Sequence, residues 1–182
     1  MKDYQLLIEA IGLLSVFFYL LSSGTSNDRK MNALGAIGSI FLGTHLFLAQ
    51  EYLASAGLGI AALRNIYSLY YDKGFVKFFF MIIFFALLGY ATINFKNWYD
   101  VLTPLAGVIV SYSVLYTEKN QRTFWLFFAT ILWFIYGLQI QSMSILLLES
   151  FITISLAFRY LKQNNLLPKY KFHNRLRSRN KL

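Results

Sequence analysis

Apolar residues fall into seven runs, separated by short polar turns. A run of about twenty apolar residues is long enough to cross a hydrocarbon layer roughly 30 Å thick as a helix. The pattern therefore predicts an all-α integral membrane protein with seven transmembrane helices, at 4–22, 31–50, 52–71, 75–93, 98–117, 123–140 and 142–161. Because no turn is long enough to hold a separate domain, we expect 1–161 to form a single membrane domain.

The composition indicates that the apolar runs lie in lipid and not in the core of a soluble protein. The chain is 57% hydrophobic but only 14% charged, whereas a soluble globular domain is about 25% charged. Glu9 interrupts the first apolar run, and that run belongs to a repeated pattern. We therefore expect the run to be a mature helix and not a cleaved signal peptide.

Basic residues predict the orientation in the membrane. The formal net charge is +9, and many of the basic residues lie in a tail at 162–182. Cytoplasmic segments of membrane proteins are enriched in Lys and Arg, which predicts a cytoplasmic C-terminus and, with seven spans, an external N-terminus. The predicted cytoplasmic turns then carry Arg29, Lys30, Lys73, Lys77, Lys119 and Arg122, and only Lys2 and Lys96 lie outside. We expect the tail to bind anionic lipid and not nucleic acid.

Residues typical of enzyme and metal sites are scarce. The chain has no cysteine and two histidines, His45 and His173, and it contains neither a zinc-protease motif nor a glycine-rich phosphate loop. We therefore expect no metal, no cofactor and no enzymatic activity. A membrane hydrolase built from Glu9, His45 and Glu149 is left as an alternative.

The two halves of the chain contain the same order of segments. In each, a helix with a small-residue segment around Gly12 or Gly107 leads to a basic turn, and two apolar runs follow. The pattern predicts two parallel three-helix repeats, 4–71 and 98–161, joined by a linker helix at 75–93. Such repeats are related by an axis along the membrane normal, and transporters of this plan bind substrate near the repeat interface. Because both repeats lie in one chain, a monomer and a homodimer are both compatible with it.

Short motifs accompany this three, one, three plan. With Trp133-Phe134-Ile135-Tyr136-Gly137 in the sixth span and Pro104 in the fifth, the chain resembles the SWEET, SemiSWEET and PnuC group of carriers. In length and layout it is more similar to the YgjV family of bacterial inner-membrane proteins, through Asn27-Asp28-Arg29-Lys30, Gly43-Thr44-His45 and Leu63-Arg64-Asn65. The resemblance extends to about residue 161. It implies two three-helix units around a central substrate path in the bacterial inner membrane, and it implies no particular substrate.

Among the ionisable residues, the pattern places Glu9, His45 and Glu149 inside the membrane. A charge deep in a bilayer is costly, so these side chains should face the bundle interior, and all three lie in the predicted outer half, where they would share one pocket. Glu149 is the strongest candidate for substrate binding, since its place in the last helix resembles that of a polar binding residue in SWEET-like carriers. We expect it to take up a proton or to pair with His45. The competing interpretation is a structural interhelical hydrogen bond.

Other residues complete the candidate site. Trp133 and Tyr136 lie one turn apart on a helix and are candidates for stacking on a ligand, as Asn65 is for hydrogen bonding. Pro104 is a candidate hinge, and Arg64, near the cytoplasmic face, is a candidate inner gate. Aromatic packing and a snorkelling arginine are the structural alternatives.

The sequence thus predicts a carrier of a small polar metabolite, sugar-like or vitamin-like, with proton coupling as an option. The alternative is a non-transporting membrane scaffold or assembly factor, whose polar residues only lock helices together.

Overall fold

The computed structural model describes residues 2–25, 27–70, 74–94, 96–116 and 119–163. Within these residues the fold has seven α-helices, one 3-10 helix and no strands. The helices are α1 (Lys2–Gly24), α2 (Asp28–Leu48), α3 (Tyr52–Tyr70), α4 (Gly74–Asn94), η1 (Trp98–Val101), α5 (Leu102–Tyr116), α6 (Lys119–Gln139) and α7 (Met143–Gln163). The all-helical prediction and the seven helices are confirmed. The predicted basic tail lies outside the described residues from 164 onward.

Local capping explains where two helices begin. The Asn27 side chain accepts a hydrogen bond from the Lys30 amide at 3.1 Å, so α2 begins three residues before the apolar run. Ahead of α5, the Asp100 carboxylate accepts the amides of Lys96 and Asn97 at 2.9 and 3.0 Å, which organises η1. Pro104 therefore lies in the first turn of α5, where a missing amide costs little, and not in the helix interior where a hinge was expected.

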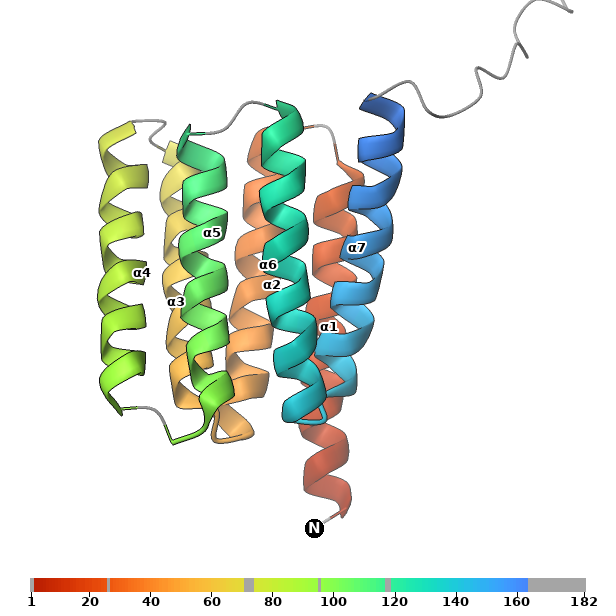
Figure 1. The fold of residues 1–182 in the computed structure, drawn as a ribbon. Helices are drawn as coiled ribbons and strands as arrows, with labels where there is room; N and C mark the ends of the chain where they lie inside the picture. The colour runs from red at the N-terminus through yellow and green to blue at the C-terminus, as the bar shows by residue number, and fades with distance from the viewer. Residues whose placement is uncertain (1, 26, 71–73, 95, 117–118, 164–182) are drawn as a thin grey trace, which may run out of the picture.

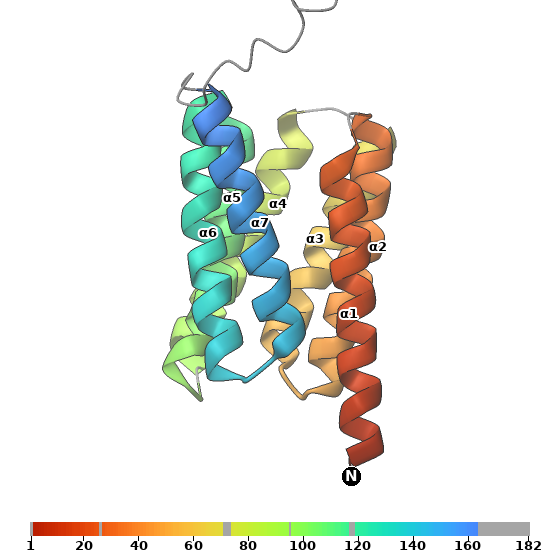
Figure 2. The same cartoon turned by 90° about the vertical axis from the view of Figure 1, so that its right-hand side faces the viewer.

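The helices form two rows. In the first row α1, α2 and α3 pack side by side in that order, and in the second row α5, α6 and α7 do the same. The rows meet where α1 packs on α7 and α3 packs on α5, while α4 covers one edge against α3 and α5 (Figures 1 and 2). In Figure 2 the rows lie close together at the end that carries the α2–α3 and α6–α7 turns, here called the turn end, and they diverge toward the opposite end.

The two turns at this end have the same backbone hydrogen bonds. After α2, the Ala49 amide donates to the His45 carbonyl, Gln50 to Phe47, Glu51 to Leu46 and Ser55 to Glu51. After α6, the Ile140 amide donates to the Tyr136 carbonyl, Gln141 to Leu138, Ser142 to Gly137 and Leu146 to Ser142. Each bond of the first turn has a counterpart in the second turn, and all four are shifted along the chain by the same number of residues, which is the separation between His45 and Tyr136. Gln50 and Gln141, also related by this spacing, both have positive φ, at 66° and 55°. The two connections are therefore the same structure built twice.

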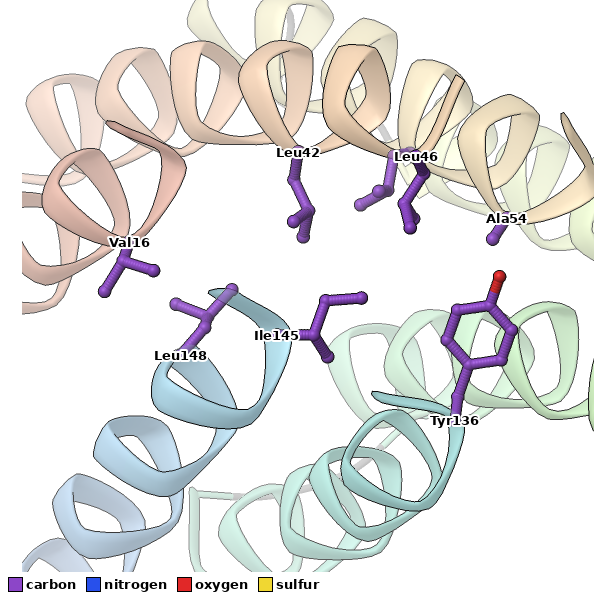
Figure 3. Packing of buried hydrophobic residues seen from close by; sticks show 8 residues of the cluster. Val16, Leu42, Leu46, Ala54, Tyr136, Ile145 and Leu148 are labelled. Carbon is purple, nitrogen blue, oxygen red and sulfur yellow. The ribbon is translucent and has the colours of Figure 1, made fainter. Parts of the chain in front are cut away.

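A buried apolar cluster joins the rows next to the turn end. Leu42 and Leu46 of α2 face Ile145 and Leu148 of α7, and Tyr136 of α6 points toward α3 (Figure 3). Apolar burial of this kind supplies shape-specific packing between the rows.

The outer surface is strongly apolar. Large hydrophobic side chains stand exposed around the bundle, for example Phe75 at 78% and Ile93 at 82% on α4. Among the described residues, the stretches Gln5–Ser23 and Arg29–Leu48 are long and apolar enough to cross a membrane, and Phe78–Asn94 and Met143–Phe158 are shorter apolar stretches. Exposed apolar area on this scale is typical of a surface that another apolar phase covers.

Candidate functional site

A cavity of about 280 Å³ lies between the rows, and all seven α-helices contribute to its wall. Its polar lining consists of Tyr19, Ser39, Arg64, Asn65, Thr103, Thr130 and Glu149. Most of the remaining wall is apolar and includes Phe84, Leu148 and Trp133. An apolar pocket with a few converging polar groups is the usual form of a small-molecule site.

Glu149 is the most unusual residue of this wall. It lies in the first third of α7 and is 5% exposed, and its Oε2 atom is buried without a hydrogen-bond partner. Buried polar atoms in proteins are nearly always paired, because an unpaired one loses its solvation without compensation. The carboxyl is therefore free for a partner that enters the cavity.

Arg64 and Asn65 bring polar groups from α3 to the same cavity. Both are half-buried. Asn65 packs over Gly35 of α2, since a Cβ added there would lie 3.2 Å from the Asn65 Nδ2 atom. Among the described residues, no hydrogen bond or ion pair engages the Arg64 guanidinium. A cation and a carboxyl thus line one cavity without pairing with each other.

The hydroxyl groups of Tyr19 and Ser39 lie 2.7 Å apart in the cavity wall, and the Ser39 hydroxyl also lies 2.8 Å from the Gly35 carbonyl, to which it can donate. Trp133 forms part of the opposite wall, on α6. Its ring meets that of Tyr136 edge to face, with centroids 5.7 Å apart. Tyr136 itself is fully buried and lies outside the cavity lining.

Three hydrogen-bonded contacts close the turn end between the rows. The His45 Nδ1 atom lies 2.9 Å from the Ile8 carbonyl, and its Nε2 atom lies 2.9 Å from the Ser142 hydroxyl. A carbonyl only accepts, so Nδ1 carries a hydrogen and donates it to Ile8, while Nε2 and the Ser142 hydroxyl share the second hydrogen bond. Tyr136 donates its hydroxyl to Glu51 Oε2 at 2.9 Å.

Glu9 makes the third contact. Its carboxylate accepts the Ser144 hydroxyl at 2.6 Å and the Ser144 amide at 3.3 Å. Ser144 is the second residue of α7, whose first amides have no partner within the helix. A carboxylate on α1 therefore caps α7 in the other row, where the helix dipole favours negative charge.

Two of these contacts are reciprocal. His45 and Tyr136 occupy matching positions in the two rows, and so do Glu51 and Ser142, because the same number of residues separates the members of each pair. His45 of the first row bonds to the turn of the second row, and Tyr136 of the second row bonds to the turn of the first. The two rows thus hold each other at the turn end through matched positions.

The predicted site residues divide into two groups. Glu149, Asn65, Trp133 and Arg64 line the cavity, whereas His45, Glu9 and Tyr136 lie in the turn-end contacts. The predicted pairing of Glu149 with His45 is wrong, because both imidazole nitrogens bond elsewhere. The single pocket shared by three ionisable residues is also wrong, because neither Glu9, which bonds to Ser144, nor His45 belongs to the cavity lining. Pro104 is buried beside the cavity-lining Thr103.

Several partners were not predicted from sequence: Tyr19, Ser39, Glu51, Ser142 and Ser144. Single hydroxyl residues in apolar helices carry no distinctive pattern. Glu51 and Ser142 do carry a signal, since they occupy the same place in the two repeated turns. Within the described part of the chain, no three His, Asp or Glu side chains gather in a set that suits a metal ion.

Comparison with known proteins places the chain in a family. A family model described as a bacterial inner membrane protein, Imp-YgjV, matches residues 6–165. No curated protein and no solved structure matches. The match spans both rows, α4 and every residue of the cavity wall. The chain belongs to the Imp-YgjV family of bacterial inner membrane proteins.

Proposed function

We propose that the protein is a carrier of a small polar metabolite and that the central cavity is its substrate site. The observation that carries this proposal is the buried Glu149 carboxyl, whose Oε2 atom has no hydrogen-bond partner, in a cavity lined by all seven α-helices. A residue that only locks helices together would be hydrogen bonded. The cavity of about 280 Å³ lies just below the range of about 300–1,000 Å³ that is usual for small-molecule pockets, so it suits a small metabolite.

The proposed three, one, three repeat plan is supported by matched positions. The turns recur, and so do the cross-row bonds of His45 and Tyr136. Cavity-lining residues of the first row also have cavity-lining counterparts in the second row at the same separation along the chain: Ser39 and Thr130, Leu42 and Trp133, Gly57 and Leu148, Leu58 and Glu149, Ala61 and Ile152, and Asn65 and Leu156. A two-fold axis between the rows would therefore pass through the cavity, which is where repeat-built transporters hold substrate.

The transport cycle that we propose rocks one row against the other. Hydrogen bonds join the rows at the turn end, and the rows diverge toward the opposite end (Figure 2). In the proposed topology of seven spans, the N-terminus is external and the basic end is cytoplasmic. The described conformation is then closed to the outside. Breaking the turn-end contacts would open the external path.

Two further features belong to the proposal. The basic tail would contact anionic lipid at the cytoplasmic surface. Glu149 would exchange a proton during the cycle, because an uncompensated carboxylate in apolar surroundings is costly and a proton removes that cost. The cavity is assigned to binding and translocation, so we expect no product to form from a bound compound.

The test is a thermal-shift screen of the detergent-purified protein against sugars, vitamins, nucleosides and amino acids. A compound that binds the folded state raises the melting temperature by mass action. We expect one class to stabilise the wild type and to lose its effect in Glu149→Gln. Proteoliposome uptake of that compound then measures transport. No stabilisation by any compound, together with a Glu149→Leu variant that unfolds more easily, would instead support the scaffold function.

A further inference from the structure

We propose that the cavity takes an amphoteric substrate, whose cationic group binds Glu149 and whose anionic group binds Arg64. This inference rests on the proposed carrier function and names the substrate class. The two residues are the charged members of the cavity wall, and they have opposite signs.

Neither charge is compensated by the protein. Glu149 has a buried oxygen without a partner, and the half-buried Arg64 side chain makes no hydrogen bond or ion pair through its guanidinium among the described residues. Burying a charge without a partner is costly, and a partner of opposite sign with hydrogen bonds recovers the cost. A single ligand that carries both signs would compensate both residues while leaving the net charge of the cavity unchanged.

The two charges lie at different depths. Leu58 of α3 matches Glu149 of α7 in the repeated pattern, and both line the cavity. Arg64 lies six residues beyond Leu58 in the same helix, and a rise of about 1.5 Å per residue separates the two levels by roughly 9 Å. Side-chain reach shortens this distance for a ligand. The substrate should therefore carry its two charges apart, on a short chain or ring.

The wall between these levels is weakly polar. The Tyr19 and Ser39 hydroxyls bond to each other, and the Trp133 ring contributes an aromatic surface. A sugar would need several hydrogen-bonding partners for its hydroxyl groups and would leave both charges uncompensated. An apolar segment between two charged ends matches the wall better.

The probes are ω-amino acids of increasing length, from glycine through β-alanine and 4-aminobutanoate to 6-aminohexanoate. In this series the ammonium and carboxylate are fixed and only their separation changes. We expect the stabilisation of the detergent-purified protein to peak at one length. At that length, the alkylamine lacking the carboxylate and the alkanoate lacking the amine should each bind at least tenfold more weakly.

Two variants assign each end. Glu149→Gln should bind the best ω-amino acid no better than the matching alkanoate, and Arg64→Gln should bind it no better than the matching alkylamine. Arg64→Lys keeps the charge on a different side chain, so it should retain the preference and shift the best length. It also provides the test if Arg64→Gln does not fold.

Four results would overturn the inference. If the alkylamine binds as tightly as the amino acid, the cavity has a site for the cationic group only. If the alkanoate binds as tightly as the amino acid, the cavity has a site for the anionic group only. If no ω-amino acid stabilises the protein while a sugar or nucleoside does, the substrate class is wrong and the carrier function survives. If no compound of any class stabilises it, the carrier function fails as well.

Discussion

Replacing Gly12 with alanine should separate the two rows at the turn end. A Cβ added at Gly12 would lie 2.6 Å from the Ser144 Cβ atom and 2.9 Å from His45 Nδ1, and it would overlap the Ser144 hydroxyl. Carbon atoms in contact lie about 3.5–4.0 Å apart, so α1 must move about 1 Å away from α7. That movement would also break the Glu9–Ser144 hydrogen bond of 2.6 Å.

The expected cost follows from these two effects. Overpacking typically costs about 1–3 kcal/mol, and a hydrogen bond to a charged group contributes about 1.5–3 kcal/mol. We expect Gly12→Ala to lower the free energy of unfolding by about 3 kcal/mol and the melting temperature by roughly 6–12 °C for a chain of this size. The assay is thermal unfolding of the detergent-purified protein.

Gly59→Ala is the matched control. Gly59 is a helix-interior glycine of α3, and a Cβ there would meet nothing within 4 Å. Alanine favours helix over glycine by about 1 kcal/mol, so the control should be neutral or slightly stabilising. Equal melting temperatures for Gly12→Ala and Gly59→Ala would refute the tight α1–α7 contact.

Three further substitutions test other contacts by the same unfolding assay. Tyr136→Phe should lower the free energy of unfolding by about 1–3 kcal/mol, because the Glu51 carboxylate loses its hydrogen-bond partner. In a Glu51→Gln background the same substitution should cost less, and an unchanged cost there would contradict the hydrogen bond. Gly107→Ala should destabilise by about 1–3 kcal/mol, since its Cβ would overlap the Phe84 ring, and Phe84→Leu should restore part of the loss. Glu149→Leu should raise the free energy of unfolding by about 1–3 kcal/mol, because an unpaired buried group disappears; a decrease would indicate a structural role.

Sequence patterns predicted the helices well and the contacts between them poorly. The lengths of the apolar runs determine where helices form, so all seven appeared in place. Glu149 was expected to face the bundle interior, because a carboxylate in an apolar run is rare and costly, and it does so. Its supposed partner His45 was misplaced, since nothing in the spacing of the two residues fixes which row each side chain faces.

The turn-end contacts show what sequence reasoning lacked. Glu9 was expected in a pocket shared with His45 and Glu149, but it caps α7 across the rows. Tyr136 was grouped with Trp133 because both lie on one helix face, yet only Trp133 reaches the cavity, while Tyr136 points to Glu51. Pairings of this kind depend on the tertiary arrangement. The repeated turn around Glu51 and Ser142 was the one local clue to them.

Water access to the cavity tests the central claim without knowledge of the substrate. Because the chain has no cysteine, Ala61→Cys would place a single thiol in the cavity wall, and Ala86→Cys would place one on the exposed face of α4 as a lipid-facing control. A membrane-impermeant thiol reagent reacts only where water reaches the thiolate. The account predicts that Ala61→Cys is modified in membranes from the cytoplasmic side and, more slowly, from the external side, while Ala86→Cys is not. No modification of Ala61→Cys from either side, with full modification after denaturation, would contradict a carrier cavity.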